Sequence, residues 1–454
     1  MVTFRADIDR GGFFRASTVL VSGTAVGQAL VLLALPVLTR LYSPEDFSVL
    51  AVFVAFLAMF SVISCLRLEV AIPISETDLE AANLLALALC LALISALLVG
   101  IGVYCFGPWL FQTFGQPQLT AFGWLLPLGV WLAGSYAAFL FWGTRKKRFA
   151  TIARTRVLQA GSGVGTMLGL GFLGAGPIGL FLGHMLLSGA GAMTLGWKLL
   201  RAERDALKGI SLRRMGAALQ KYRRFPQYAT LETFSEHAAT HLAIVLIAAL
   251  ALGPEAGFVL LAMRALGAPV NMIANALRQV FISQAADEAR AGRLPDFTAH
   301  ILKIAALVTI GPLVFVAMIA PDAFAVIFGE QWRRAGELVL WMMPWFVLKL
   351  LSAPVAMVMH VLRMQRAMLV LMLSGLCLRI AMTLGAYAID AAYIAEGYAI
   401  SGMVVYLLAL SVYLRVARAP VAQLLLIARS AALSLLIGLI AGVVALSIIA
   451  RIGL

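Results

Sequence analysis

The sequence predicts an all-α, polytopic membrane protein, and three observations support this fold class. Of the 454 residues, 62% are hydrophobic and only 12% are charged. The mean hydropathy is +0.97, which no soluble globular domain of this length approaches. The hydrophobic residues form runs of about 20, the length that a helix needs to cross the hydrocarbon core of a bilayer.

The predicted helices follow one another along the whole chain, with short loops between most of them. There are thirteen, near residues 16–38, 48–72, 84–106, 120–142, 157–174, 178–197, 229–252, 258–281, 301–320, 338–362, 367–389, 393–414 and 430–450. The four cysteines lie singly inside apolar runs, so they predict neither disulfides nor a metal site.

The basic residues of the loops predict the orientation of the chain. With the N-terminus in the cytoplasm, the cytoplasmic side receives Arg5, the basic stretch 145–156 and the basic linker 198–224. Lysine and arginine accumulate in the cytoplasmic loops of membrane proteins. We therefore expect a cytoplasmic N-terminus, and the net charge of +14 does not require a nucleic-acid partner.

An internal repeat predicts the organisation into lobes. The motif at Ser43–Ala51 recurs 210 residues later from Gly253, and the motif at Gly107–Gly115 recurs 213 residues later from Ala320. This predicts two pseudo-symmetric six-helix bundles plus about one extra C-terminal helix, with a total of 12 to 14 transmembrane helices. The expected parts are an N-terminal lobe (1–197), a cytoplasmic basic linker (198–227), a C-terminal lobe (228–416) and an interfacial segment with the extra helix (417–454).

The stretch 228–252 is polar in its first half and apolar in its second half. Glu232, Glu236, His237 and His241 fall on one helical face, which should point toward protein or water rather than lipid. One interpretation is a proton or sodium coupling site, because histidine titrates near neutrality. The other is that the carboxylates lie among headgroups and linker arginines while the histidines bond to neighbouring helices. No other cofactor is expected.

Three cations lie well inside predicted spans, and all three belong to the second bundle. A cavity lined by Arg264, Lys349 and Arg379 would attract a phosphate or pyrophosphate. The alternatives are snorkelling of Arg264 to the membrane surface and pairing of these cations with carboxylates of the polar stretch.

Polar groups of the first bundle give weaker predictions. Arg67 lies two residues before Glu69, so it is either a ligand contact or part of a local ion pair. Thr24 and Gln28 would line the same cavity or serve polar packing between helices, which is the commoner use. The glycines of 161–185 favour close helix packing over a phosphate loop, because no Lys-Ser/Thr follows them.

Several segments together resemble the polysaccharide transport family of the multidrug/oligosaccharidyl-lipid/polysaccharide exporter superfamily. These segments are LTRLYSPEDFSVLAVF, LRLEVAIP, FWGTRKKRFATIARTRVLQA, RRFPQY, AMRALGAP and ALRQVF. The resemblance covers nearly the whole chain, and Arg264 matches an arginine that the family often shows in the AMRALGAP segment.

The resemblance implies a flippase, not an enzyme. It would move an undecaprenyl-pyrophosphate-linked oligosaccharide, such as an O-antigen, capsule or exopolysaccharide repeat unit, from the cytoplasmic to the periplasmic leaflet of a bacterial inner membrane. The implied mechanism is alternating access of the two lobes around a cationic cavity. Implied partners are the lipid-linked oligosaccharide, membrane lipid, a polysaccharide polymerase and chain-length proteins.

Three alternatives remain open from the sequence. A cation-coupled multidrug antiporter of the same superfamily would need acidic cavity residues, which Glu232 and Glu236 supply. A lipid II flippase is expected to carry two further helices. A membrane polysaccharide polymerase or ligase would need an ordered periplasmic site, and the longest predicted outer loop holds no carboxylate and histidine constellation.

Overall fold

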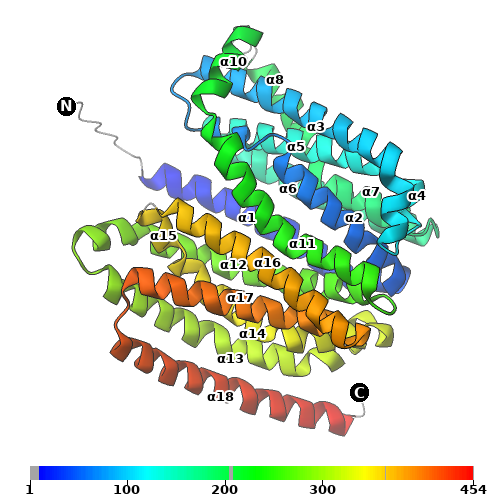
Figure 1. Ribbon diagram of the computed structural model, residues 1–454, viewed down its shortest axis with the longest axis vertical. Helices are drawn as coiled ribbons and strands as arrows, with labels where there is room; N and C mark the ends of the chain where they lie inside the picture. The colour runs from blue at the N-terminus through cyan, green and yellow to red at the C-terminus, as the bar shows by residue number, and fades with distance from the viewer. Residues whose placement is uncertain (1–9, 204–207, 363, 453–454) are drawn as a thin grey trace. The chain divides into compact units, whose positions relative to one another are not determined.

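The computed structural model describes residues 10–203, 208–362 and 364–452, and their regular structure is helical throughout (Figure 1). In a bilayer, backbone N–H and C=O groups have no water to bond, so a spanning segment satisfies them within its own helix. Within the described residues, twelve helices are long and apolar enough to span a membrane, which is within the predicted range of 12 to 14.

The fifth predicted span, 157–174, is also a helix, but it begins earlier and is less apolar than the twelve. Helix α6 (Phe149–Phe172) includes Arg154 and Arg156, which the sequence interpretation placed in a cytoplasmic loop. These two cations and its many glycines keep α6 out of the set of twelve. The structure explains the longer helix, because the Arg156 side chain donates a hydrogen bond to Thr24 of α1 (Arg10–Leu41).

Contacts within the chain group its residues into two units. Unit 1 comprises Met1–Tyr42 and Phe53–His237, and unit 2 comprises Ser43–Val52 and Ala238–Leu454. The chain therefore passes from one unit to the other three times: just before α2 (Pro44–Ile63), within α2, and within α11 (Thr230–Leu250).

Unit 1 consists of long helices joined by short turns. Besides α1, α6 and parts of α2 and α11, it holds η1 (Leu68–Ala71), α3 (Asp78–Thr113), α4 (Leu119–Phe122), α5 (Leu125–Arg145), α7 (Ile178–Gly189), α8 (Gly191–Ala202), α10 (Leu212–Lys221) and η2 (Phe225–Ala229). Helix α1 packs on α6, α6 on α7, and α3 on α5.

Glycines allow the closest helix contacts of unit 1. A Cβ atom added at Gly163 would lie 2.7 Å from the carbonyl oxygen of Gly183, and one added at Gly183 would lie 2.6 Å from that of Gly163. Helices α6 and α7 could not approach this closely with larger residues. The prediction that this glycine-rich region serves helix packing is confirmed.

The linker is fastened to the start of α3. The buried Asn83 side chain accepts a hydrogen bond from the Ser211 N–H at 3.1 Å and donates one to the Gly209 carbonyl at 3.4 Å. At the other end of α10, Lys221 Nζ lies 2.7 Å from a carboxylate oxygen of Glu80. Both ends of this short helix are therefore attached to one turn of α3.

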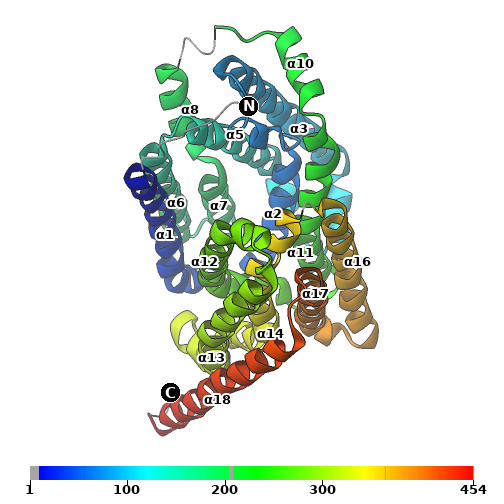
Figure 2. The ribbon, with the colours of Figure 1, turned by 90° about the vertical axis from the view of Figure 1, so that its left-hand side faces the viewer.

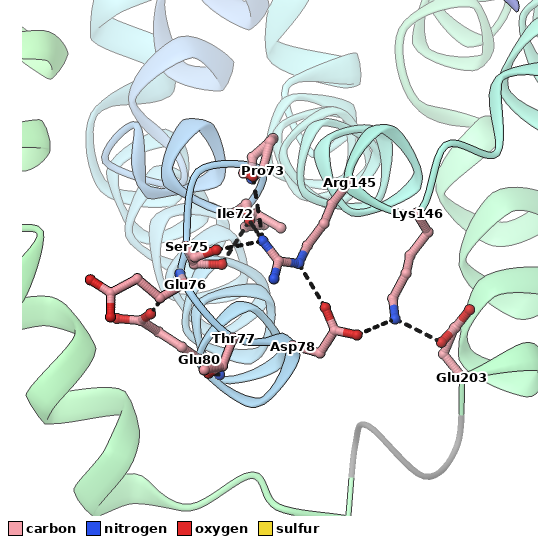
Figure 3. Close-up of polar contacts among 10 residues, drawn as sticks. All are labelled: Ile72, Pro73, Ser75, Glu76, Thr77, Asp78, Glu80, Arg145, Lys146 and Glu203. Carbon is pink, nitrogen blue, oxygen red and sulfur yellow. Dashed lines mark hydrogen bonds and ion pairs between the residues drawn. The ribbon is translucent and has the colours of Figure 1, made fainter. Parts of the chain in front are cut away.

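A second group of polar contacts closes the same end of unit 1 (Figure 3). Arg145 donates hydrogen bonds to the carbonyl of Ser75 at 2.7 Å and to Asp78 at 3.0 Å. Lys146 lies between Asp78, at 2.8 Å, and Glu203, at 3.0 Å. These contacts join the loop before α3 to the end of α5 and to the residue that follows α8.

Unit 2 is built around one helix, α14 (Arg333–Val355), which contacts three others. It contains α12 (Glu255–Arg290), α13 (Leu294–Phe328), η3 (Glu330–Trp332), α14 (Arg333–Val355), α15 (Met357–Val361), α16 (Gln365–Ile389), η4 (Ala391–Tyr393), α17 (Ile394–Ala417) and α18 (Val421–Ile452). Helix α14 packs against α12, α13 and α17, while α16 packs on α17 and α18 on α13. Figure 2 shows α18 crossing beside α13.

The two copies of the repeated motif meet in unit 2. Phe47 and Phe258, which lie at corresponding places in the repeat, both contact the buried indole of Trp332, with ring centroids 4.8 Å and 5.9 Å away. Gly257 allows this approach, because a Cβ atom there would lie 2.3 Å from the Pro44 carbonyl oxygen.

Candidate functional site

The predicted site residues belong to two units, and each set is described within its own unit. Unit 1 contains Thr24, Gln28, Arg67, Glu232, Glu236 and His237. Unit 2 contains His241, Arg264, Lys349 and Arg379.

Arg379 is the most deeply buried of the predicted cations. Its residue is only 3% exposed, and its guanidinium lies over two aromatic rings. The guanidinium carbon is 4.5 Å from the ring centroid of Trp345 on α14 and 5.3 Å from that of Tyr398 on α17. Such cation–π contacts contribute about 2 kcal/mol when they are desolvated, less than the cost of burying an unpaired charge.

The group around Arg379 has hydrogen-bond donors without acceptors. Nε and Nη1 of Arg379, and Nε1 of Trp345, have no hydrogen-bond partner among the described residues. All three atoms are donors only. Buried donors of this kind normally have a partner, so this cluster is suited to an anionic oxygen or a water molecule.

The packing beneath Trp345 is close. Gly402 of α17 lies against the indole, and a Cβ atom at this position would be 2.4 Å from the ring. Tyr398 is fully buried and its hydroxyl contacts the Met263 sulfur of α12 at 3.5 Å. Helices α12, α14, α16 and α17 thus jointly hold Arg379. We did not predict Trp345 or Tyr398, because nothing in their local sequence marks them as partners of a residue on α16.

Arg264 and Lys349 have a different environment from Arg379. Both are half-buried, Arg264 on α12 and Lys349 on α14, and both make polar or electrostatic contacts. His241, on the part of α11 that belongs to unit 2, is also half-buried and in contact with a partner. The structure therefore places all three predicted cations of the second bundle in one unit, and Arg379 alone inside an aromatic cluster.

In unit 1, Arg67 forms an ion pair with Glu69, which was one of its two predicted roles. Its Nη1 lies 3.2 Å from a carboxylate oxygen of Glu69, and the Arg67 side chain remains 28% exposed while that of Glu69 is 5% exposed. Burial raises the pKa of Glu69, although the charge of Arg67 opposes this shift. Leu66 and Arg67, in the turn between α2 and η1, have positive φ angles of 50° and 60°, which turn the chain into η1.

The polar face of α11 lies near this ion pair. His237 is half-buried and within electrostatic range of both Glu236 and Arg67. Glu236 is exposed, and Glu232 is half-buried one turn earlier. The structure thus brings Arg67, Glu236 and His237 together, from two segments that are far apart in the sequence.

The polar residues of α1 make different contacts. Thr24 accepts the hydrogen bond from Arg156 that joins α1 to α6. The Gln28 side-chain carbonyl is buried and has no hydrogen-bond partner among the described residues. Arg156 is therefore a further charged residue between packed helices. The sequence does not predict this position, because Arg156 follows Arg154 and a basic loop.

Comparisons with known proteins identify the family and the fold. The chain matches the model of a family described as polysaccharide biosynthesis protein over residues 37–337. No curated protein sequence matches it significantly.

Among solved structures, the fold is similar to that of the lipid II flippase MurJ in an inward closed conformation, with a TM-score of 0.63 and 14% identity, over 96% of this chain and 99% of that one. It is also similar to a transporter of the MOP superfamily from Pyrococcus furiosus, with a TM-score of 0.60 and 17% identity, over 88% and 95% of the two chains. A multidrug resistance MATE family transporter of the same superfamily gives 0.58 and 16%, over 87% and 94%.

These likenesses agree with the resemblance drawn from the sequence. The similar structures establish a MOP-type fold, and the family model covers about two thirds of the 454 residues. The chain is a multi-pass membrane protein that belongs to the polysaccharide biosynthesis protein family.

Proposed function

We propose that this protein is a flippase for undecaprenyl-pyrophosphate-linked oligosaccharide repeat units, such as those of O-antigen, capsule or exopolysaccharide. It moves them from the cytoplasmic to the periplasmic leaflet of a bacterial inner membrane by alternating access. The observation that carries this proposal is the combination of a polysaccharide biosynthesis family with a fold made of membrane-spanning helices. A membrane step in polysaccharide synthesis that needs such a fold is the transfer of a lipid-linked sugar between leaflets.

The cations of unit 2 support an anionic substrate. Arg379 presents unsatisfied donors inside the helical packing, and Arg264 and Lys349 lie on neighbouring helices of the same unit. A pyrophosphate has the oxygen acceptors that these donors need. Under this proposal Arg264, Lys349, Arg379 and Arg67 contact the substrate, and the polar face of α11, with Thr24 and Gln28, lines its path. Coupling to protons or sodium through Glu232, Glu236, His237 and His241 is part of the same proposal.

A lipid II flippase is the second candidate. The fold similarity to MurJ covers 99% of that chain, so the length of the C-terminal region does not separate the two functions. Lipid II carries the same polyprenyl pyrophosphate chemistry and differs in its sugar. Multidrug antiport is the third candidate, because a MATE transporter shares the fold.

The test uses purified protein reconstituted into proteoliposomes with a fluorescent lipid-linked oligosaccharide. A membrane-impermeant quencher measures how much of the label reaches the opposite leaflet. We expect transfer that depends on the protein and that unlabelled polyprenyl-pyrophosphate oligosaccharide inhibits. Transfer of lipid II alone would support the second candidate, and efflux of organic cations without lipid transfer would overturn the proposal.

A further inference from the structure

The part of the linker that contains α10 carries an unusual concentration of positive charge. Residues 208–224 contain no aspartate or glutamate and six cations, namely Lys208, Arg213, Arg214, Lys221, Arg223 and Arg224. The hydrogen bonds of this segment attach it to the start of α3.

Helix α10 is fastened near the start of α3, a helix long and apolar enough to span a membrane. The candidate span begins at Asp78, and Asn83, which bonds the segment before α10, is five residues further on. At a rise of 1.5 Å per residue, this contact is about 8 Å along the span. Figure 1 shows α10 running across the start of α3 rather than alongside it. A helix that crosses the start of a spanning helix is expected at the headgroup region of the bilayer.

One side of α10 packs on unit 1, and an apolar edge remains outside. Met215 and Ala218 are buried. Leu212 is 85% exposed and Leu219 is 38% exposed, and with Gly216 they follow a spacing of four and three residues along one edge of the helix. Ile210, 37% exposed, precedes the helix. An exposed apolar edge beside basic residues is typical of helices that lie in a membrane interface.

The basic residues beside this edge are available to an external anion. Arg213, Arg223 and Arg224 are exposed and form no ion pair within the part of the chain that the structure describes. By contrast, Lys221 is engaged by Glu76 and Glu80 on the side that faces α3. The contacts with α3 therefore engage Lys221 and leave these three arginines exposed and without an ion pair among the described residues.

We propose that the exposed edge of α10 and its flanking residues (Ile210, Leu212 and Leu219, with Arg213, Arg223 and Arg224) dock on anionic phospholipid headgroups of the leaflet that borders the linker. The apolar side chains enter the interface, and the arginines bind lipid phosphates. Anionic lipid is the partner because the surface combines a net positive charge with exposed hydrocarbon, whereas a soluble phosphate would use only the charge. This docking does not depend on the transported substrate.

The test places a fluorophore that reports polarity on Leu212→Cys of the full chain, after Cys90, Cys105 and Cys377 are replaced by alanine. The fourth cysteine, Cys65, is buried. The protein is embedded in nanodiscs of phosphatidylcholine with increasing fractions of phosphatidylglycerol. We expect a blue shift of the emission that grows with the phosphatidylglycerol fraction and weakens with salt.

Charge variants separate the proposed surface from general attraction. Arg213→Gln/Arg223→Gln/Arg224→Gln should raise the phosphatidylglycerol fraction needed for half of the shift by at least about fivefold, or abolish the shift, since each arginine near a charged membrane contributes about that factor. The corresponding lysine variant should retain the shift. Arg366→Gln/Arg415→Gln/Arg418→Gln, a matched change at exposed positions of unit 2, should leave it unchanged.

Two results would overturn the proposal. The first is an emission spectrum that does not change with the phosphatidylglycerol fraction, or a blue shift that is the same in the wild type and the glutamine variant. Either would mean that headgroup charge plays no part. Loss of the blue shift on addition of inorganic pyrophosphate would mean that the arginines serve a soluble phosphate group. Because the readout is the emission of a label at residue 212 and not the transfer of lipid, failure of the flippase assay has no bearing on either result.

Discussion

The guanidinium of Arg379 lies 4.5 Å from the ring centroid of Trp345, deep within unit 2. If the unsatisfied donors of this cluster bind the substrate phosphate, Arg379→Gln should lower the rate of lipid-linked sugar transfer at least tenfold, equivalent to about 1.4 kcal/mol. The thermal unfolding midpoint should stay the same or rise, because the variant no longer buries a charge. Flipping and unfolding are measured on the same purified samples.

Two further variants interpret this result. Arg379→Lys keeps the charge but loses the planar group that stacks on Trp345, so it should restore transfer only in part. Arg366→Gln removes an exposed cation from the same helix and should transfer at the wild-type rate. Normal transfer by Arg379→Gln would show that the arginine has a purely structural role.

Gly402 sets the position of Trp345. In Gly402→Ala the new Cβ atom would lie 2.4 Å from the indole, so the ring has to move. Overpacking of this kind costs about 1 to 3 kcal/mol, and we expect a lower unfolding midpoint together with slower transfer. Gly385→Ala on α16 is the control, because nothing lies within 4 Å of a Cβ atom there. Equal midpoints for the two variants would contradict the close packing.

The sequence predicts the spans of this protein better than its site. Twenty apolar residues have few alternatives to a membrane helix, so the spans are visible in composition alone. The aromatic partners of Arg379 come from α14 and α17, and only tertiary packing brings Trp345 and Tyr398 to it. The sequence places Arg156 in a loop for the same reason, because its partner Thr24 lies on a helix far away in the sequence. The sequence showed the ionisable residues but could not show which of them are enclosed.

The Asn83 side chain holds the linker to α3 through two hydrogen bonds with the linker backbone. Asn83→Ala leaves the Ser211 N–H and the Gly209 carbonyl without this partner, which costs about 1 to 3 kcal/mol when such groups are buried. We expect faster trypsin cleavage at Arg213 and Arg214 in detergent. Lys221→Met removes the ion pairs of the half-exposed Lys221 with Glu76 and Glu80 at the other end of α10, and it should accelerate cleavage much less. Equal acceleration would mean that charge, rather than Asn83, fastens the linker.

Ser434 fastens α18 to α13 next to Pro312, which lies inside that helix. Its hydroxyl accepts a hydrogen bond from the Gly311 N–H at 2.9 Å and donates one to the Leu307 carbonyl at 3.0 Å. Ser434→Ala should lower the stability by about 1 to 3 kcal/mol, because a buried N–H loses its acceptor. Ser447→Ala, whose hydroxyl bonds only within α18, is the control in the same thermal unfolding experiment. A destabilisation of the control that matches Ser434→Ala would argue against this contact.

Glu69 gives the protein a defined pH dependence. Burial raises its pKa above the usual value of 4.5, so the folded state holds the proton more tightly than the unfolded state does. The resulting stabilisation is fully present below pH 4.5 and is lost as the pH rises through the raised pKa. Glu69→Gln cannot titrate. Its unfolding midpoint should therefore fall less than that of the wild type between pH 4.5 and neutral pH.

The comparison with Glu76→Gln isolates the effect of burial. The Glu76 side chain is 78% exposed, so its replacement should leave the slope of the midpoint against pH close to the wild-type slope. The ion pair with Arg67 opposes the shift at Glu69, and Arg67→Gln should therefore steepen the loss of stability with rising pH. If Glu69→Gln and the wild type show parallel curves over this range, the carboxylate is solvated in the protein and its pairing with Arg67 dominates.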